Sequence, residues 1–471
     1  METIIQQILT QMAKKITEKA FSGKIADIDD LATDALEDCK QAAASIIETI
    51  TEQMNQAIRT DKAGRKELGL TLKEKDRPRT LLTQLGPLHL KRDYYYNHEA
   101  QAHMNILDPI LGIEKYQRIG GNVGARLVEL ATEVSYAKSA QITTGGAVSR
   151  QTVKNQIRKS IVPEVKADPN EPKKTVSQLH IYADEDHVHM QKENKTKGKK
   201  NKITPLVSVT EGTNSIGRRN RTLAPMHFAD ETFDTRKLWK SVEGYIQATY
   251  ELESIENIYI HADGGKWIEN GLENFPQLKH VMDGYHLEKE LKALSKHFPK
   301  QAVKHRLTEA IKEDDRKRAD QILQELLRKA ETPKQEKEVG RIGTYLLSHW
   351  DAIVRRKTLN IPGSCTEAQI SHILSERFSR DPLGWSEEGL GKLVCLRVYV
   401  KNGGTLTKEN FKKESQKTIR YHEYADQIIK EAVAGCTDWS IFESTPPIFN
   451  GASGTQNLIR GMGMMRNTLV N

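Results

Sequence analysis

Cysteines and long apolar runs are scarce in this sequence, and each scarcity excludes a class of protein. Only four cysteines occur in 471 residues, and no two of them form a CxxC pair. That pattern excludes a zinc knuckle and a disulfide framework, and it favours a reducing compartment. No stretch approaches the roughly 20 apolar residues of a membrane span, and the amino terminus lacks the charged-then-apolar layout of a secretory signal. We therefore expect a cytoplasmic protein.

The charge balance and the length bound the partner and the number of domains. Lysine and arginine outnumber aspartate and glutamate by 71 to 63, which gives a formal net charge of +8 and a pI of about 9.0. A basic balance favours a polyanionic partner such as DNA. Single hydrophobic cores rarely grow beyond about 250 to 300 residues, so a chain of 471 residues should hold two or three domains.

The first part of the chain has a helical pattern that gives way to a strand pattern. Apolar residues recur at helical spacing near the amino terminus, at Ile4, Ile5, Ile8, Leu9, Met12 and Ile16. The segments LGLTLKEK and GPLHLKRDYYYN then favour a pair of strands. We expect a helical region over residues 1–62, which is also the expected contact between subunits, and a second domain over residues 63–161.

The end of that second domain has the outline of a helix-turn-helix. The segment SYAKSAQITTGGAVSRQTVKNQIRK predicts a short helix, a turn at Gly145 and Gly146, and a second helix capped by Ser149. In such motifs the second helix faces DNA. The side chains expected to do so are Arg150, Gln151, Lys154, Asn155 and Arg158. The alternative interpretation is an ordinary helical hairpin with a solvated basic face.

The middle of the chain alternates between strands and helices after a proline-containing linker at residues 162–175. Three strand patterns suit antiparallel neighbours, and a helix, a fourth strand, a fifth strand and another helix follow. This succession favours an α/β ribonuclease-H-like core with a mixed sheet, and the alternative interpretation is a different mixed sheet with the same order of elements. We expect its first part over residues 176–298, an all-α insertion over 299–360, its last part over 361–404 and a tail over 405–471.

Carboxylates stand at the ends of the predicted strands. Asp184 lies in the first strand and Asp263 ends the fourth, and these strands are adjacent and parallel in a ribonuclease-H-like sheet. Asp186 is the alternative first acid. Glu367, at a helix start after the insertion, is the expected third ligand, with Glu376 and Glu388 as its rivals. An all-oxygen site suits Mg²⁺ or Mn²⁺ better than zinc, and two such ions hydrolyse phosphodiesters.

Basic clusters and one tryptophan complete the set of candidates. Lysines crowd the connection after the first strand, and we expect Lys199 and Lys200 to contact DNA phosphates there. The other interpretation of this run is a solvated loop. Trp350, in the insertion, is expected to belong to a hydrophobic core rather than to stack on a flipped base.

Five segments carry a resemblance to a known family. They are VSRQTVKNQI, YADEDHVHMQ, HADGGKWI, VMDGYHLEKEL and EAQISHILSERFSRDPLGWS, in this order. Together they resemble the ISLre-type transposases of bacterial insertion sequences, which are related to the Mutator-like DDE enzymes. The resemblance covers about residues 60 to 400.

The resemblance implies a catalytic site and an activity. Asp184, Asp263 and Glu367 would be the DDE triad, and Asp283 with His286 would match the DxxH signature that follows the second acid. The protein would bind the ends of its element, cleave DNA with Mg²⁺ and join the freed 3′-hydroxyl to target DNA, as a homo-oligomer. The alternative is a non-catalytic or repurposed DNA-binding protein derived from a transposase, and a third hypothesis is a structure-selective nuclease or resolvase.

Overall fold

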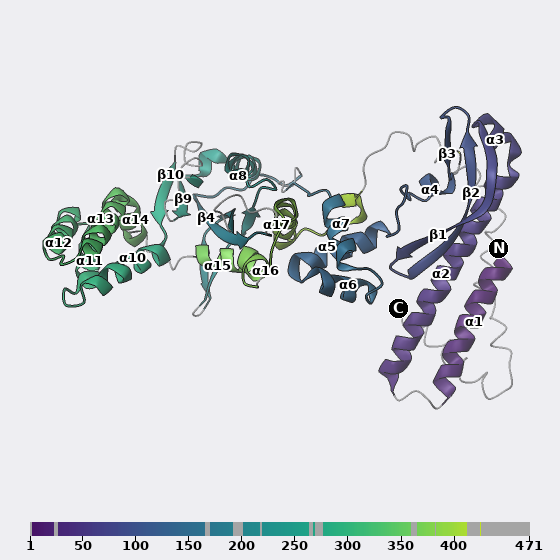
Figure 1. Ribbon diagram of the computed structural model, residues 1–471, viewed down its shortest axis with the longest axis horizontal. Helices are drawn as coiled ribbons and strands as arrows, with labels where there is room; N and C mark the ends of the chain where they lie inside the picture. The colour runs from purple at the N-terminus through teal and green to yellow at the C-terminus, as the bar shows by residue number, and fades with distance from the viewer. Residues whose placement is uncertain are drawn as a thin grey trace. The chain divides into compact units, whose positions relative to one another are not determined.

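The chain folds into two compact units. The computed structural model describes residues 2–22, 27–164, 170–191, 201–216, 219–262, 267–268, 277–358, 365–381, 383–411 and 424. One unit holds residues up to Ala125 with the described residues from Thr407 onward, and the other holds Arg126–Leu406. The division falls inside helix α5 (Gly121–Glu133). The expected helix-turn-helix therefore belongs to the same unit as the five-stranded sheet (Figure 1).

The first unit packs long helices against a three-stranded antiparallel sheet. Its elements are α1 (Glu2–Phe21), α2 (Ile28–Thr60), α3 (Lys62–Glu67), β1 (Leu70–Thr83), β2 (Gly86–Asn97), β3 (Ala102–Met104), α4 (Leu107–Ile110) and the short 3₁₀ helix η4 (Lys408–Phe411). The sheet order is β1-β2-β3, and α2 runs along β2 (Figure 1). The expected strand pair is thus a long hairpin, closed where Thr83 pairs with Gly86.

A buried carboxylate fastens α2 to β2. The Asp93 side chain is fully buried and accepts hydrogen bonds from Arg59 Nε at 2.7 Å and Asn55 Nδ2 at 3.1 Å. It also accepts one from the backbone N–H of Asp76 at 3.0 Å. A buried charge is tolerated only when it is paired and hydrogen-bonded, and here both conditions hold.

The second unit is built on a mixed five-stranded sheet. Its strands are β4 (Gln178–His189), β5 (Asn201–Thr210), β8 (Met226–Phe228), β9 (Asn257–Ala262) and β10 (Leu278–Met282), in the order β10-β9-β4-β5-β8. β4 is antiparallel to β5, β5 is antiparallel to β8, and β4, β9 and β10 are mutually parallel. The first and fourth strands of the sheet are therefore adjacent and parallel, as the sequence pattern indicates.

The third strand of this sheet is shorter than its sequence pattern suggests. The pattern RTLAPMHFA predicts one strand, but only Met226–Phe228 joins the sheet. Residues Arg219–Thr222 form β7, which pairs with β6 (Thr213–Ile216) in a separate two-stranded ribbon. The chain turns between β7 and β8 at Ala224, which has a positive φ of 43°.

Each face of the sheet has its own covering. Helix α8 (Thr235–Thr249) packs its apolar side on alternate strand residues such as Leu179, Ile181 and Ala183. The other face is covered in part by short helical segments, with α15 against β4 and α17 against β8. These segments are α15 (Thr366–Ile370), η3 (Ser371–Ser375), α16 (Glu376–Phe378) and α17 (Glu387–Lys401).

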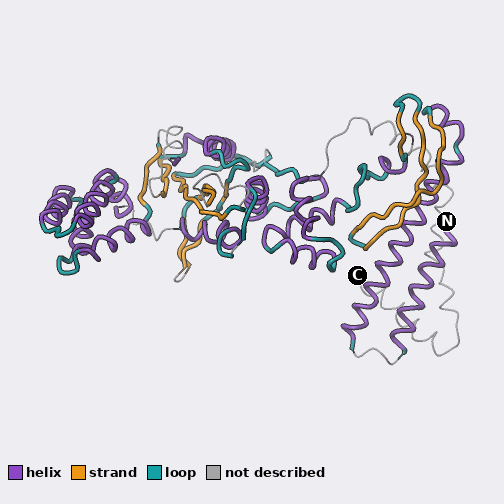
Figure 2. The backbone as a smooth tube through the Cα atoms, viewed as in Figure 1, coloured by secondary structure: helices purple, strands orange, loops and turns teal. Residues whose placement is uncertain are grey.

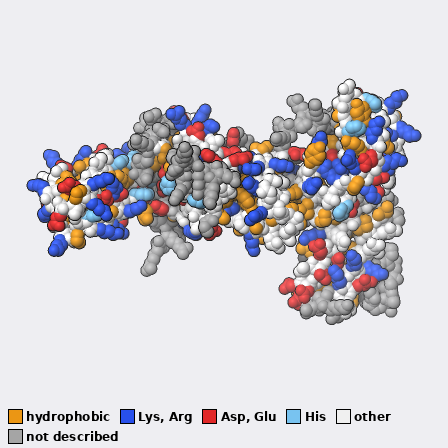
Figure 3. All heavy atoms as spheres, viewed as in Figure 1, with side chains coloured by type: hydrophobic (Ala, Val, Ile, Leu, Met, Phe, Trp, Pro, Cys, Tyr) orange, Lys and Arg blue, Asp and Glu red, His pale blue; other side chains and the backbone are white. Residues whose placement is uncertain are grey.

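The expected all-α insertion forms a helical subdomain with its own core. It contains α11 (Val303–Lys312), α12 (Arg316–Arg328), α13 (Pro333–Ser348) and α14 (Trp350–Thr358), which lie within the predicted range. It also contains α10 (Gly284–His297), which the sequence pattern places in the first part of the core. These helices gather at the left of Figure 2, where α14 packs against β10. Trp350 is 4% exposed in this core, and its Nε1 donates to Asp314 at 2.8 Å, so the core interpretation is confirmed. Lysine and arginine are scattered over the outer surface (Figure 3).

Candidate functional site

Acidic residues gather at one edge of the sheet because three neighbouring strands are parallel. The carboxyl ends of β9 and β10 lie at that edge, beside the middle of β4, which continues to His189. Asp184 lies in β4, and Asp283 directly follows β10 and donates its N–H to Ala262 O at 3.0 Å. Asp263 follows Ala262, the last residue of β9, but lies outside the described residues. The described part of the edge thus holds two of the predicted acidic positions.

Strand alternation separates the three acids of the first strand. Glu185 lies on the α8 side, where it accepts a hydrogen bond from Trp267 Nε1 at 2.5 Å. Asp184 and Asp186 point to the opposite face. Asp186 is 9% exposed, and its Oδ2 is buried with no hydrogen-bond partner among the described residues. Both rivals for the first acid therefore share one face, and the choice between them stays a prediction.

Beneath these acids the same face carries a layer of neutral histidine and tyrosine. His180 Nδ1 and His261 Nε2 are 2.9 Å apart, and Tyr182 stacks on His261 with ring centroids 4.5 Å apart. Burial, with smaller contributions from His180 and Arg356, lowers the pKa of His261 to about 3, so this imidazole is uncharged at neutral pH. Sequence reasoning missed this layer, although the alternating motifs HIYAD and YIHAD contain both histidines.

The start of α10 combines an acid, a histidine and an arginine. Asp283 is 1% exposed, and its Oδ2 lies 3.0 Å from His286 Nδ1 one turn later. Arg356 of α14 places Nη1 4.0 Å from Asp283 Oδ1. A Cβ added at Gly284 would lie 2.2 Å from the Arg356 guanidinium, so a larger residue there would have to displace that side chain. Arg356 is a cation at this edge that sequence reasoning did not single out.

The third predicted acid is carried by a helix that packs on the first strand. α15 contacts β4, and Cys365 lies close enough to Tyr182 to raise the pKa of that phenol, after the larger effect of burial. Cys365 occupies the N-cap position of α15 without a side-chain hydrogen bond to the helix. Glu367 follows two residues later and has no ion-pair partner among the described residues.

Its two rivals are already paired. Glu376 Oε1 lies 3.0 Å from His372 Nδ1, and Glu388 Oε2 lies 3.3 Å from Arg158 Nη2. Within the residues that the structure describes, no group of three or more His, Cys, Asp or Glu is arranged to hold a metal ion. Asp263 is not among those residues. The donors at the edge are carboxylate oxygens, a chemistry that fits Mg²⁺ or Mn²⁺.

The helix-turn-helix outline is present, but one side of its second helix is covered. α6 (Tyr136–Thr144) ends at Gly145 in the left-handed conformation, with φ of 60°, and the Ser149 side chain caps α7 (Arg150–Lys159). Val153 and Ile157 are buried, and α7 packs on α17.

The predicted DNA-facing side chains of α7 do not all point outward. Arg150, Gln151, Lys154 and Arg158 line a pocket shared with the region around α17. Asn155 is exposed and accepts a hydrogen bond from Gln151 at 3.1 Å. Lys199 and Lys200 lie outside the described residues.

Fold and site together define a mixed α/β protein with an acidic sheet edge, a helical insertion and a helix-turn-helix element. The chain belongs to the UPF0236 family, because the family model described as "Uncharacterised protein family (UPF0236)" matches residues 24–415. A UPF0236 protein of Caldanaerobacter subterraneus subsp. tengcongensis is 33% identical over 438 residues, which cover 91% of each chain. Another from that organism is 36% identical over 82% of this chain and 80% of its own, and its name joins eleven locus designations.

More distant similarities are weaker. A UPF0236 protein of Streptococcus gallolyticus, named for the vanSb 3′ region, is 25% identical over 68% of this chain and 71% of its own. Among solved structures, the Drosophila P element transposase strand transfer complex aligns with 67% of this chain and 92% of that one, at 10% identity and a TM-score of 0.22. This score is too low to establish a shared fold. No helix among the described residues is long and apolar enough to span a membrane.

Proposed function

We propose that this protein is a DNA transposase of the DDE type that cleaves DNA and joins a 3′-hydroxyl to target DNA. The observation that carries the proposal is the parallel placement of β4 next to β9. Asp184 lies in β4 two residues beyond its last pair with β9, Asp283 directly follows β10, and Asp263 directly follows β9 in the sequence. Strand order β10-β9-β4-β5-β8, with only β5 antiparallel to both neighbours, is the order expected of a ribonuclease-H-like core.

Chain connectivity supports Asp263 as the partner of Asp184. Tyr182 pairs with His261 in the parallel ladder, and each acid stands two residues further along its own strand or chain. In the sequence Asp263 directly follows Ala262, the last residue of β9. Glu367, on the helix that packs against β4, supplies the third carboxylate in this proposal.

Each group at the edge has a role in the proposed reaction. Asp184, Asp263 and Glu367 would hold Mg²⁺ or Mn²⁺, which when bound activates the attacking water or 3′-hydroxyl and stabilises the leaving oxygen. Asp283 holds His286 through their 3.0 Å contact. In this arrangement His286 is oriented to contact a substrate phosphate, and the neutral His180 and His261 add no cation that would compete with the metal.

The relatives support a mobile genetic element. One relative carries eleven locus designations and another four, and a protein encoded at many loci in one genome is what an insertion sequence produces. In this proposal the protein acts in the cytoplasm at the nucleoid and assembles as a multimer on the ends of its element.

Substitution of the acids tests the proposal. With DNA that carries the inverted repeats flanking the gene, and with Mg²⁺, Asp263→Asn, Asp184→Asn and Glu367→Gln should each lower strand cleavage by at least about 10³-fold while leaving end binding intact. Glu376→Gln is the matched control, because Glu376 is already paired with His372 and should be dispensable.

The outcomes separate the candidate functions. Cleavage that persists in Asp263→Asn contradicts the site assignment. End binding without any cleavage by the unmodified chain favours the repurposed DNA-binding protein. Cut products without joined products favour the structure-selective nuclease.

A further inference from the structure

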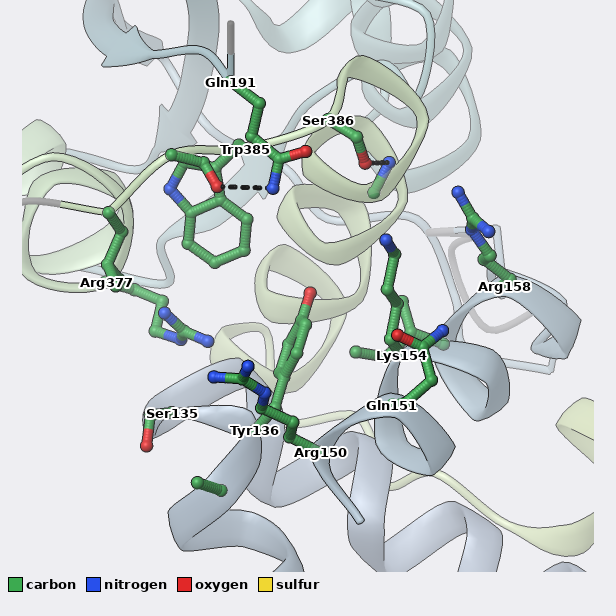
Figure 4. Close-up of a pocket in the computed structure, with 15 residues that line it drawn as sticks. Ser135, Tyr136, Arg150, Gln151, Lys154, Arg158, Gln191, Arg377, Trp385 and Ser386 are labelled. Carbon is green, nitrogen blue, oxygen red and sulfur yellow. Dashed lines mark hydrogen bonds between the residues drawn. The ribbon is translucent and has the colours of Figure 1, made fainter. Parts of the chain in front are cut away.

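A basic pocket lies between the helix-turn-helix and the start of α17. Its cavity measures about 330 Å³. Arg150, Lys154 and Arg158 contribute from α7, Tyr136 from α6, and Arg377 and Trp385 from the chain before α17 (Figure 4). No acidic side chain lines it among the described residues. The sheet-edge acids Asp184 and Asp283 are not part of it, so this is a second candidate site.

Arg377 is a buried cation with no close ion-pair partner in the described part of the chain, where Asp381 and Glu133 act on it only at longer range. It is 5% exposed, its Nε donates to Ala131 O at 3.0 Å, and no carboxylate lies within 4.0 Å of it among the described residues. Its guanidinium carbon lies 4.9 Å from the Trp385 ring centroid and 5.9 Å from that of Tyr136, and the group points into the pocket (Figure 4). Burial lowers its pKa. An uncompensated buried charge is costly, so a bound anion would stabilise it.

Two more cations face the same space, and neither has an acidic partner among the residues that the structure describes. Neither Arg150 nor Lys154 has a carboxylate within ion-pair distance there, whereas Arg158 is paired with Glu388 at 3.3 Å. The amino terminus of α17, capped by Ser386, adds the positive end of a helix dipole. Glu387 and Glu388 in that first turn offset part of this potential. The net field in the pocket still favours an anion.

The size and the walls of the pocket define the anion. A single water fills only about 30 Å³, so 330 Å³ holds far more than a bare phosphate ion. Cavities of about 300 Å³ and above accommodate organic ligands. The Tyr136 ring stands at 80° to the Trp385 indole and gives the pocket an apolar wall. Aromatic walls beside cations bind a base or sugar together with its phosphate.

We propose that this pocket binds one nucleotide unit of a DNA strand, with its phosphate on Arg377, Arg150 and Lys154 and its sugar and base against Tyr136. The choice of DNA as the source of that nucleotide rests on the proposed function, but the binding requires neither the metal nor the acids of the sheet edge. It gives α7 a role other than insertion into a major groove, since its basic side is turned toward α17.

The test is a binding measurement in EDTA with the full chain and a short fluorescein-labelled single-stranded oligonucleotide. Arg150→Gln combined with Lys154→Gln should weaken binding about tenfold or more. It should also lower the slope of log K against log salt by about 0.7 for each phosphate that the variant no longer neutralises. The matched control is Lys237→Gln combined with Lys240→Gln, which removes two exposed charges from α8 in the same unit. Binding by the control should be nearly unchanged.

Two further measurements make the test specific. Arg377→Lys keeps the charge but loses the planar fork, and it should weaken binding without the change in circular dichroism that unfolding would cause. If the Arg377→Lys protein unfolds, the variant that combines Arg150→Gln with Lys154→Gln tests the proposal in its place. In competition, thymidine 5′-monophosphate should displace the oligonucleotide at lower concentration than inorganic phosphate or thymidine does. Failure of the mononucleotide to displace the strand would contradict the proposal.

Specific results would overturn the inference. Equal losses of affinity in the α7 pair and the α8 control would show only general electrostatic attraction. Competition by inorganic phosphate as strong as that by thymidine 5′-monophosphate would show a plain anion site. Because metal is absent throughout, a chain that never cleaves DNA can still pass this test, and a chain that cleaves DNA can fail it.

Discussion

Removal of the buried charge at Asp93 should destabilise the packing of α2 against β2 in the first unit. In Asp93→Asn the amide nitrogen would face the Arg59 guanidinium, donor against donor, in place of the carboxylate that now accepts its hydrogen bonds at 2.6 and 2.7 Å. Breaking a buried ion pair by altering one partner costs about 3 to 5 kcal/mol. Arg59 retains its contact with Asp76, so we expect a loss of about 3 kcal/mol.

The control substitution uses the same arginine. Asp76→Asn removes the other carboxylate of Arg59, but that side chain is 46% exposed, so the expected cost is below about 1 kcal/mol. Hydrogen exchange of the α2 and β2 amides in the full chain measures both losses as local free energies of opening. Equal losses in the two variants, or a loss under about 1 kcal/mol for Asp93→Asn, would refute the reasoning.

The pH dependence of Asp93 adds a second readout. Burial raises the pKa of this carboxyl, but hydrogen bonds from Arg59, Asp76 and Asn55 outweigh it and hold the pKa below its ordinary value. The stabilisation is therefore complete above the ordinary aspartate pKa of about 3.9 and is lost as the pH falls through the lower folded value. Asp93→Asn should lack this acid-dependent loss.

Two further predictions concern the second unit. Burial lowers the pKa of His261 to about 3 and that of His227 to about 4, so the unfolded chain binds protons below about pH 6.5 that the folded chain does not. The stabilisation is complete above that pH, and below it each such histidine lowers it by up to roughly 1.4 kcal/mol per pH unit. Because burial also lowers the pKa of His180, His261→Phe should remove only the part of this slope that comes from His261. Hydrogen exchange of β4 and β9 between pH 7 and pH 5 measures the slope, and an unchanged slope would contradict the prediction. Gly391→Ala places a Cβ 1.8 Å from Glu231 O and should cost about 1 to 3 kcal/mol or more of stability. Gly340→Ala, whose added Cβ meets nothing within 4 Å, should be neutral or stabilising by up to about 1 kcal/mol. Thermal unfolding measures both, and similar shifts of the melting temperature in the two variants would contradict the prediction.

Local patterns in the sequence account for much of the fold. The alternation in QLHIYADEDHVH predicts a strand, and β4 spans Gln178–His189. The Leu and Ile stripe after Phe298 predicts helices, and they form the insertion. The period-2 pattern of strands and the period-3.6 pattern of helices depend only on neighbouring residues, so both can be recognised in the sequence before the fold is known. The strand pattern places Arg221 and Thr222 in the wrong sheet, because the partner strand and not the segment's own pattern decides which sheet it joins.

The candidate site, like the fold, is predictable from the sequence only in part. Aspartates at strand ends are visible in the sequence, and parallel pairing places their strands side by side. The contact of Arg356 with Asp283 is not visible, because it joins residues on an insertion helix and a strand end far apart in the chain. Asp263 and the lysines at 199 and 200 remain predictions, since they lie outside the described residues.

By itself the sequence determined most of the helices and strands, the basic charge and the acids that lie in or directly after three strands, since each depends on residues close together in the chain. Only the tertiary structure decided which side of α7 is covered, that His180 meets His261, and that Arg377 faces Arg150 across a pocket. Those contacts join residues from 81 to more than two hundred positions apart. Their existence depends on packing free energy, which no local pattern encodes.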